Sequence, residues 1–397
     1  MAGLKIPGLK EGETRIVIIV FAASLLIAVG IVAFVNFGQA KIKHEVSKVA
    51  TAAKGKFLAQ DSATKLSGID IEANKIAASD KSAPLQNRIA HLIRVAQSEP
   101  NDRGAQLDLG TCLISAGEYD SAVDVLSSMH ATSTGDSIDG LADTRLSLAM
   151  YRAGRVSTAA VLIDSCNKKY PAIAEGWCIR GEIEMALDLT SDSAEAHFRK
   201  ALTIDDNYPE GLYQISRWYM LRPKLTRLDV QKAGVALGHL LSIEPMNGKA
   251  LGRMGMVCQY LGRRDESRKY YESALSINPD DFTTHYNLGV LLADQFADPA
   301  GALIQFLAVL KLKSDHLQAN FRIGLICLSN NTDKEAAQYF RKALSSDPRN
   351  VRAMLQLGVA YEKLGLKSDA LNVYHSVVAI DPLNDIALHK LEMLAGT

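Results

Sequence analysis

Apolar residues follow two patterns along the chain, and the first is one uninterrupted run. Residues 16–37 form 22 consecutive positions without a charge. About 20 apolar residues suffice for a helix to cross the hydrocarbon core of a bilayer. A buried core helix or a cleaved signal peptide would also be apolar, but a signal peptide has a shorter apolar region and a small-x-small cleavage site, which Phe34 to Phe37 lack. We therefore expect a tail at 1–15 and an uncleaved transmembrane helix at 16–37.

Basic residues flank this run and bear on its orientation. Three lie in the tail, and five lie beyond the run, at Lys41, Lys43, Lys48, Lys54 and Lys56. That count favours a cytoplasmic C-terminal side, whereas a long domain is translocated largely regardless of its charge. We expect a single-pass protein of the bacterial inner membrane with a periplasmic C-terminal domain. A cytoplasmic domain is the alternative, which unpaired cysteines favour because they suit a reducing compartment.

The residues after this run lack a strong apolar period until residue 84. Residues 38–83 are rich in Ala, Lys, Ser and Asp, a composition that predicts a flexible linker. Its basic start is either the ordinary flank of a membrane helix or a contact with anionic lipid head groups. Residues 84–102 then predict a leading helix.

The second pattern is a repeat of small and large residues with a period near 34. A small residue recurs at intervals of 34 to 39 residues, a second follows about twelve positions later in most units, and a large apolar residue follows four positions after that. The first series is Gly110, Ser147, Gly181, Ser216, Gly255, Gly289, Gly324 and Gly358. The second is Ala122, Ala159, Ala194, Ala233, Ser267, Ala302, Ala336 and Ala370. The third is Leu126, Ile163, Phe198, Leu237, Tyr271, Phe306, Phe340 and Tyr374.

A proline closes most of these units, and the whole pattern resembles the tetratricopeptide repeat (TPR) family. The prolines are Pro171, Pro245, Pro279, Pro348 and Pro382. The resemblance implies an all-α fold, in which a right-handed superhelix (an α-solenoid) of about eight helix pairs follows the membrane helix. The expected units are 103–139, 140–173, 174–208, 209–247, 248–281, 282–316, 317–350 and 351–384, with a capping helix at 385–397. The first unit lacks its proline, Arg180 replaces an apolar residue in the third, and the fourth has an insertion in its turn, at 221–229.

Each repeated residue type has a physical reason. Small residues are expected where the two helices of a unit approach most closely, and the large apolar residue should fill the space between neighbouring units. Proline ends the second helix because it cannot continue it. Four glycines stand in the turns within units, where a positive φ is expected: Gly117, Gly154, Gly262 and Gly365.

Composition and motifs argue against an enzyme. Lys plus Arg and Asp plus Glu both number 44, so net charge gives no reason to expect nucleic acid as a partner. The five cysteines are widely spaced and the histidines scattered, so we expect no metal site and interpret the cysteines as buried core residues. Phosphate-binding and nucleophile motifs are absent. We therefore predict no enzyme activity, no catalytic residue, no cofactor and no small-molecule substrate.

The family resemblance places a partner-binding groove on the first helix of each unit, at its second, fifth, ninth and twelfth positions. This register selects Tyr151, Met185, Tyr213, Arg217, Met220, Met256, Gln259, Tyr286 and Phe321. Tyr, Arg and Met are enriched at interfaces, although any one of these residues could instead pack between helices. The Lys/Asn/Arg clamp that some members use for a terminal carboxylate is missing. An apolar or amphipathic helix or an extended peptide is the expected ligand.

These observations favour a membrane-anchored scaffold for protein–protein interactions. We expect it to recruit partner proteins for the assembly of the bacterial envelope or of a secretion system. Two alternatives remain open from the sequence: a chaperone-like holder of unfolded envelope proteins, and a cytoplasm-facing regulator of a membrane enzyme.

Overall fold

The structure, a computed structural model, describes residues 83–133 and 135–395. Every regular element in these ranges is a helix, which confirms the all-α prediction for this part of the chain. The expected tail 1–15, membrane helix 16–37 and nearly all of the linker 38–83 lie outside the described residues. Among the helices that are described, none is both long enough and apolar enough to cross a membrane.

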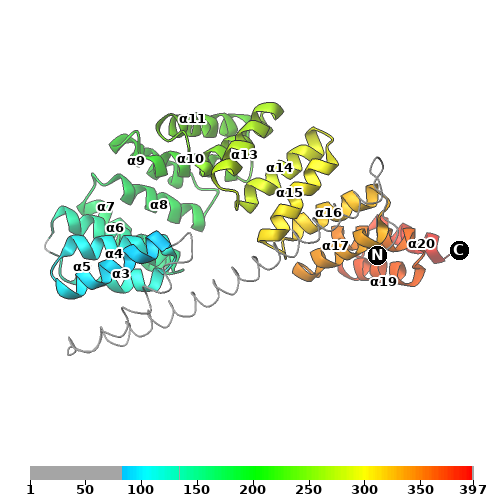
Figure 1. The fold of residues 1–397 in the computed structure, drawn as a ribbon, viewed down its shortest axis with the longest axis horizontal. Helices are drawn as coiled ribbons and strands as arrows, with labels where there is room; N and C mark the ends of the chain where they lie inside the picture. Colours follow the sequence, from blue (N-terminus) through cyan, green and yellow to red (C-terminus); the bar gives the residue numbers. More distant parts are fainter. Residues whose placement is uncertain (1–82, 134, 396–397) are drawn as a thin grey trace, which may run out of the picture. The chain divides into compact units, whose positions relative to one another are not determined.

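The described helices follow one another as antiparallel pairs (Figure 1). The chain divides into two compact units, one ending at Ile179 and the other starting at Arg180, inside helix α8. The first unit contains α3 (Ala83–Ser98), α4 (Arg103–Ala116), α5 (Tyr119–Ala131), α6 (Ser137–Arg152), α7 (Val156–Lys169) and the start of α8 (Ala174–Leu187).

The second unit contains the rest of α8 and the helices up to the C-terminal end of the described chain. They are α9 (Ser193–Ile204), α10 (Pro209–Leu221), α11 (Arg227–Ile243), α12 (Gly248–Tyr260), α13 (Arg264–Ile277), α14 (Phe282–Gln295), α15 (Pro299–Leu312), α16 (Leu317–Ser329), α17 (Asp333–Ser346), α18 (Val351–Lys363), α19 (Lys367–Ile380) and α20 (Asp385–Ala395). Even-numbered helices from α4 to α18 are the first helices of eight pairs, and the helix that follows each is its partner.

The repeated small and large residues form the buried seam of each pair. All the alanines and the serine of the second series, and all the large apolar residues of the third, have no exposed surface. A Cβ atom placed on Gly289 would lie 2.7 Å from the ring of Phe306, and one on Gly324 would lie 2.6 Å from Phe340. Each ring therefore lies directly on the glycine of its own pair. It also packs toward the next pair, as expected, since Phe306 shares one buried cluster with Ala319 and Ile323 of α16.

Helix ends follow the residues that the repeat places there. Each of the five repeat prolines lies one residue beyond the C-cap of a second helix, as at Pro279 after α13. The turn glycines Gly117, Gly154, Gly262 and Gly365 have φ between 71° and 82°, so the predicted need for a positive φ is confirmed. In two further pairs Asn331 (φ 56°) and Ala297 (φ 51°) adopt this left-handed conformation, which an L-residue adopts at a steric cost.

The start of the second pair differs from the expected boundary at residue 140. Helix α6 begins at Ser137 because Asp136 caps it: the Asp136 carboxylate accepts a hydrogen bond from the backbone N–H of Asp139 at 2.9 Å. The Asp139 carboxylate in turn accepts one from the backbone N–H of Asp136 at 3.2 Å. This reciprocal capping starts the helix three residues earlier than the spacing of small residues indicated.

Candidate partner-binding surface

Half-buried apolar side chains mark the exposed side of successive first helices in the second unit. Tyr213 on α10, Met256 on α12, Tyr286 on α14 and Phe321 on α16 were all predicted to line the groove, and all four are partly exposed. We call the exposed side of α10, α12, α14, α16 and α18 the first-helix face. Partial exposure lets these side chains contact a ligand while their inner atoms remain packed in the repeat core.

Two of these aromatic rings are each covered by an arginine from the next helix pair. The Arg253 guanidinium on α12 lies 5.1 Å from the ring centroid of Tyr213 and donates a hydrogen bond to its hydroxyl at 3.2 Å. The Arg352 guanidinium on α18 lies 5.3 Å from the centroid of Phe321. Stacking of this kind holds both partners and leaves the edges of the guanidinium free to donate to a ligand.

Tyr286 is positioned by aromatic neighbours. Its ring centroid lies 5.7 Å from that of Phe306 and 5.3 Å from that of His316, the N-cap residue of α16. Burial and the neighbouring charge of Lys313 lower the pKa of His316. A lowered histidine pKa leaves this ring neutral at physiological pH, so the aromatic cluster carries no charge there.

A small pocket is formed by residues of α14, α15 and α16. Its volume is about 200 Å³, and its walls are formed by Ala293, Phe306, Arg322, Leu325, Ile326 and Ser329. At its edge the Arg322 guanidinium donates to both carboxylate oxygens of Asp294, at 2.9 and 3.1 Å. This two-bond geometry fixes the arginine, so the pocket combines an apolar floor with an oriented charged pair.

Of the other residues predicted for the groove on this unit, two are buried and two are partly exposed. Met185 and Met220 are only 4% and 8% exposed, so they are core residues, and their prediction as contact residues is wrong. Arg217 donates to the side chain of Gln214 at 3.3 Å, and Gln259 accepts from the hydroxyl of Tyr271 at 2.9 Å. These two remain partly exposed.

Tyr151 belongs to the other compact unit. It lies on α6, where the Arg152 guanidinium is 5.3 Å from its ring centroid.

The same unit contains Cys166, whose thiol pKa is raised by burial. Cys112, Cys166, Cys178 and Cys258 are buried, as predicted, and Cys327 is partly buried.

Sequence reasoning missed the arginines that organise this surface. Arg253 and Arg322 occupy the sixth position of their units, whereas the register of the family resemblance selects only the second, fifth, ninth and twelfth positions. Arg352 occupies a second position but stands alone in its unit without an aromatic partner. The signal in the sequence was an aromatic residue in one unit followed by an arginine in the next, a pairing that a search within single units cannot detect.

Comparison with protein families identifies the repeats. Residues 248–281, 293–350 and 334–392 each match a family model described as tetratricopeptide repeat. The superkiller complex protein 3 of Homo sapiens is 25% identical over 289 residues, which is 70% of this chain but 18% of that protein. The peroxisomal targeting signal receptor of Saccharomyces cerevisiae is 30% identical over 117 residues, 29% of this chain and 19% of the receptor.

Solved structures agree with the fold. A chain in the crystal structure of the APC/C hetero-tetramer Cut9–Hcn1 superposes with a TM-score of 0.55 and 14% sequence identity, covering 80% of this chain and 63% of that one. This likeness concerns the fold alone. The family matches, the residues of the repeat and the helix pairs agree, and residues 248–281 and 293–392 are therefore identified as tetratricopeptide repeats.

Proposed function

We propose that this protein is a scaffold for protein–protein interactions whose first-helix face binds a segment of a partner protein. Tetratricopeptide repeats act as protein-interaction scaffolds. The observation that supports this proposal most strongly is the row of half-buried Tyr213, Met256, Tyr286 and Phe321, with arginines stacked on two of the rings. Tyr and Arg carry a large share of binding energy at interfaces.

The rigidity of this row supports its use in binding. Ordering a long side chain on association costs about 0.5–1.5 kcal/mol. Arg253 is already held by the hydroxyl of Tyr213, and Arg322 is held by Asp294. Because these arginines are ordered before a ligand arrives, less of the interaction energy is lost in ordering them. The pocket of about 200 Å³ beside Arg322 accommodates one apolar side chain of the partner.

We also propose that residues 16–37 anchor the scaffold in a bacterial inner membrane. The support is the length of the uncharged run and its basic flanks, which suit a bilayer span. In this proposal the repeats lie in the periplasm and recruit partners for envelope or secretion-system assembly. The orientation is tested by fusing a reporter to the C-terminus. We expect activity from an alkaline phosphatase fusion, which requires the periplasm. Fluorescence from a fusion to a reporter that is active only in the cytoplasm would show that the repeats lie in the cytoplasm.

Site-directed photo-crosslinking in cells tests the binding surface. A photo-reactive amino acid replaces Tyr286 or Phe321 on the first-helix face, and Val235, which is 75% exposed on the second helix α11, is the control position. We expect one dominant adduct from positions 286 and 321 and none from 235. Adducts of many sizes would favour a chaperone-like holder, and equal adducts from all three positions would exclude the first-helix face as the specific site.

A further inference from the structure

The turn between α10 and α11 is longer than its counterparts in the pairs that follow. It comprises residues 222–226, whereas the next four turns of this kind each comprise three residues: 261–263, 296–298, 330–332 and 364–366. The additional residues form part of the insertion noted in the sequence. This turn lies next to the C-terminal end of α12 and creates a surface that the repeat pattern does not require.

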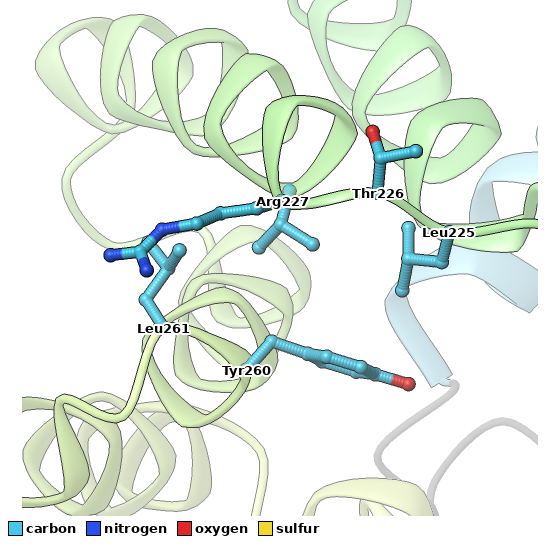
Figure 2. Close-up of a pocket in the computed structure, with 6 residues that line it drawn as sticks. Leu225, Thr226, Arg227, Tyr260 and Leu261 are labelled. Atoms are coloured by element: carbon cyan, nitrogen blue, oxygen red, sulfur yellow. The ribbon is translucent and has the colours of Figure 1, made fainter.

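A pocket of about 190 Å³ lies between the long turn and the end of α12 (Figure 2). It is lined by Leu225, Thr226, Arg227, Val230, Tyr260 and Leu261. Figure 2 shows the Tyr260 ring on one side and the Arg227 side chain extending across the other toward Leu261. Tyr260, the last residue of α12, is 64% exposed, although tyrosine side chains are on average more buried than this.

Apolar exposure continues beside the pocket. Leu221, the last residue of α10, is 42% exposed, and Leu228 in the first turn of α11 is 58% exposed. Together with Tyr260 they place three large exposed apolar residues at or next to one long turn. Clustered apolar exposure of this kind marks interaction sites more often than isolated exposed residues do.

The long turn is held in place from both ends. Arg222 donates to Asp192 at 3.2 Å and to Asp229 at 3.5 Å, and its guanidinium lies 4.8 Å from the ring centroid of the buried Trp218. Thr226 caps α11 by accepting from the backbone N–H of Asp229 at 3.2 Å. These contacts fix Leu225 and Thr226, so the pocket exists before a ligand arrives.

The carboxylate nearest the turn faces inward. Asp229 is 5% exposed and accepts hydrogen bonds from the backbone N–H of Thr226 at 3.0 Å and from its hydroxyl. Burial disfavours its charged form, but the hydrogen bonds from Thr226 and the charge of Arg222 outweigh burial and lower the pKa of Asp229. The negative charge of Asp229 and the positive charge of Arg222 therefore neutralise each other within the turn.

The rim of the pocket is consequently positive. Lys224 and Arg227 are exposed, and neither forms an ion pair with any residue that the structure describes. Farther along, Arg263 and Arg264 have acidic partners, Glu266 at 3.8 Å and Asp265 at 4.0 Å. Arg227 in the pocket lining, and Lys224 beside the lining residue Leu225 in the turn, thus carry uncompensated positive charge at this apolar hollow, an arrangement that complements a ligand with carboxylates beside an apolar group.

We propose that this pocket binds an acidic segment of a partner protein that inserts one large apolar side chain between Tyr260 and Leu225. The cavity is below the range of roughly 300–1,000 Å³ typical of small-molecule sites, so one side chain is a suitable occupant. Lys224 and Arg227 bind Asp or Glu residues that flank the anchor. This turn pocket is a second binding surface, and the proposal does not depend on the first-helix face.

A peptide-display selection tests this proposal. A library of random 12-residue peptides is selected against the full chain purified in mild detergent, and enriched peptides are measured by fluorescence anisotropy against three variants. Arg227→Glu and Tyr260→Ser alter the pocket at exposed positions. Lys367→Glu is the matched control, because Lys367 is the first residue of α19 as Arg227 is of α11.

The expected result is enrichment of peptides that combine acidic residues with one Leu, Phe, Tyr or Trp. Their affinity should fall roughly tenfold or more in Arg227→Glu and in Tyr260→Ser and remain unchanged in Lys367→Glu. Failure to enrich such peptides, or equal binding by all three variants, would overturn the proposal. Concentration-dependent dimerisation that Tyr260→Ser abolishes would show that the occupant is a second copy, which also overturns it.

Discussion

At the scale of single residues, the repeats are governed by a size match between two positions. In six pairs the first helix carries glycine at the close approach, and in five of these six the large residue of the second helix is aromatic. In one of them, a Cβ atom placed on Gly255 would lie 2.6 Å from the ring of Tyr271. Where the first helix carries Ser147 or Ser216, the aligned residue is Ile163 or Leu237, and all four are fully buried. A larger residue on one helix is matched by a smaller one on the other because the interior is close-packed.

The substitution Gly289→Ala tests this size match. The added methyl group would lie 2.7 Å from the ring of Phe306, so the helices must separate. We expect a loss of about 1–3 kcal/mol in the free energy of unfolding, measured by urea denaturation. Gly238→Ala is the control, because a Cβ there meets its nearest atom, in Met254, at 4.0 Å. It should gain about 0.5–1 kcal/mol, as alanine normally does in a helix.

At the scale of elements, polar clusters join one pair to the next. Between α9 and α10 the hydroxyl of Tyr219 donates to Glu195 at 2.7 Å, and Arg199 donates to the same carboxylate at 2.8 Å. Burial disfavours ionised Glu195, yet the hydrogen bonds from Tyr219 and Arg199 outweigh it and lower the Glu195 pKa. Burial and the hydrogen bond to Glu195 raise the pKa of Tyr219 to about 12. The two shifts share one contribution, the hydrogen bond that the neutral phenol donates to the carboxylate.

Alkaline titration should reveal this contact. The folded-state pKa of Tyr219 exceeds its unfolded value near 10, so its contribution to stability is complete below pH 10 and is lost as the pH rises toward 12. We expect that the stability difference between the native chain and Tyr219→Phe shrinks by on the order of 2 kcal/mol across this window, measured by denaturant unfolding at fixed pH values. A Tyr219→Phe difference that stays constant across this pH window would contradict the assignment.

At the scale of the whole chain, stability is shared between neighbouring helix pairs. Phe340 on α17 has no exposed surface, packs on Gly324 of its own pair, and shares one buried cluster with Leu357 and Ala360 of α18 in the next pair. The last pair is covered by α20, whose Ala387 is fully buried with Tyr374 in one cluster. Such an array is stabilised by contacts between adjacent pairs, so damage should remain local.

Hydrogen exchange tests whether damage remains local. Phe340→Ala leaves a cavity that should cost about 3–5 kcal/mol, and amide protection should fall in α16 to α19 while α10 to α13 retain theirs. Ile304→Ala, at a position 65% exposed on α15, is the control and should change little. A uniform loss of protection from α9 to α20 would show instead that this compact unit unfolds as a single cooperative body.

The candidate binding surface was predictable in part. Tyr213, Met256, Tyr286 and Phe321 follow from the register of the repeat, because partial exposure recurs at fixed helical positions. Met185 and Met220 share that register but are buried. Whether a methionine at such a position packs inward depends on the neighbouring helices, which a pattern within one unit does not include.

The amino-acid sequence alone determined the helix pairs, their buried seam and the ends of most helices. It did so because glycine, alanine, large apolar residues and proline act through local geometry and size, and these residues recur about every 34 positions. Only the tertiary structure decided that Arg253 and Arg352 cover aromatic rings of the preceding pair, and that the long turn at 222–226 borders a pocket with Tyr260. These features join residues 31 to 40 positions apart, and their contact depends on how one helix pair packs on the next.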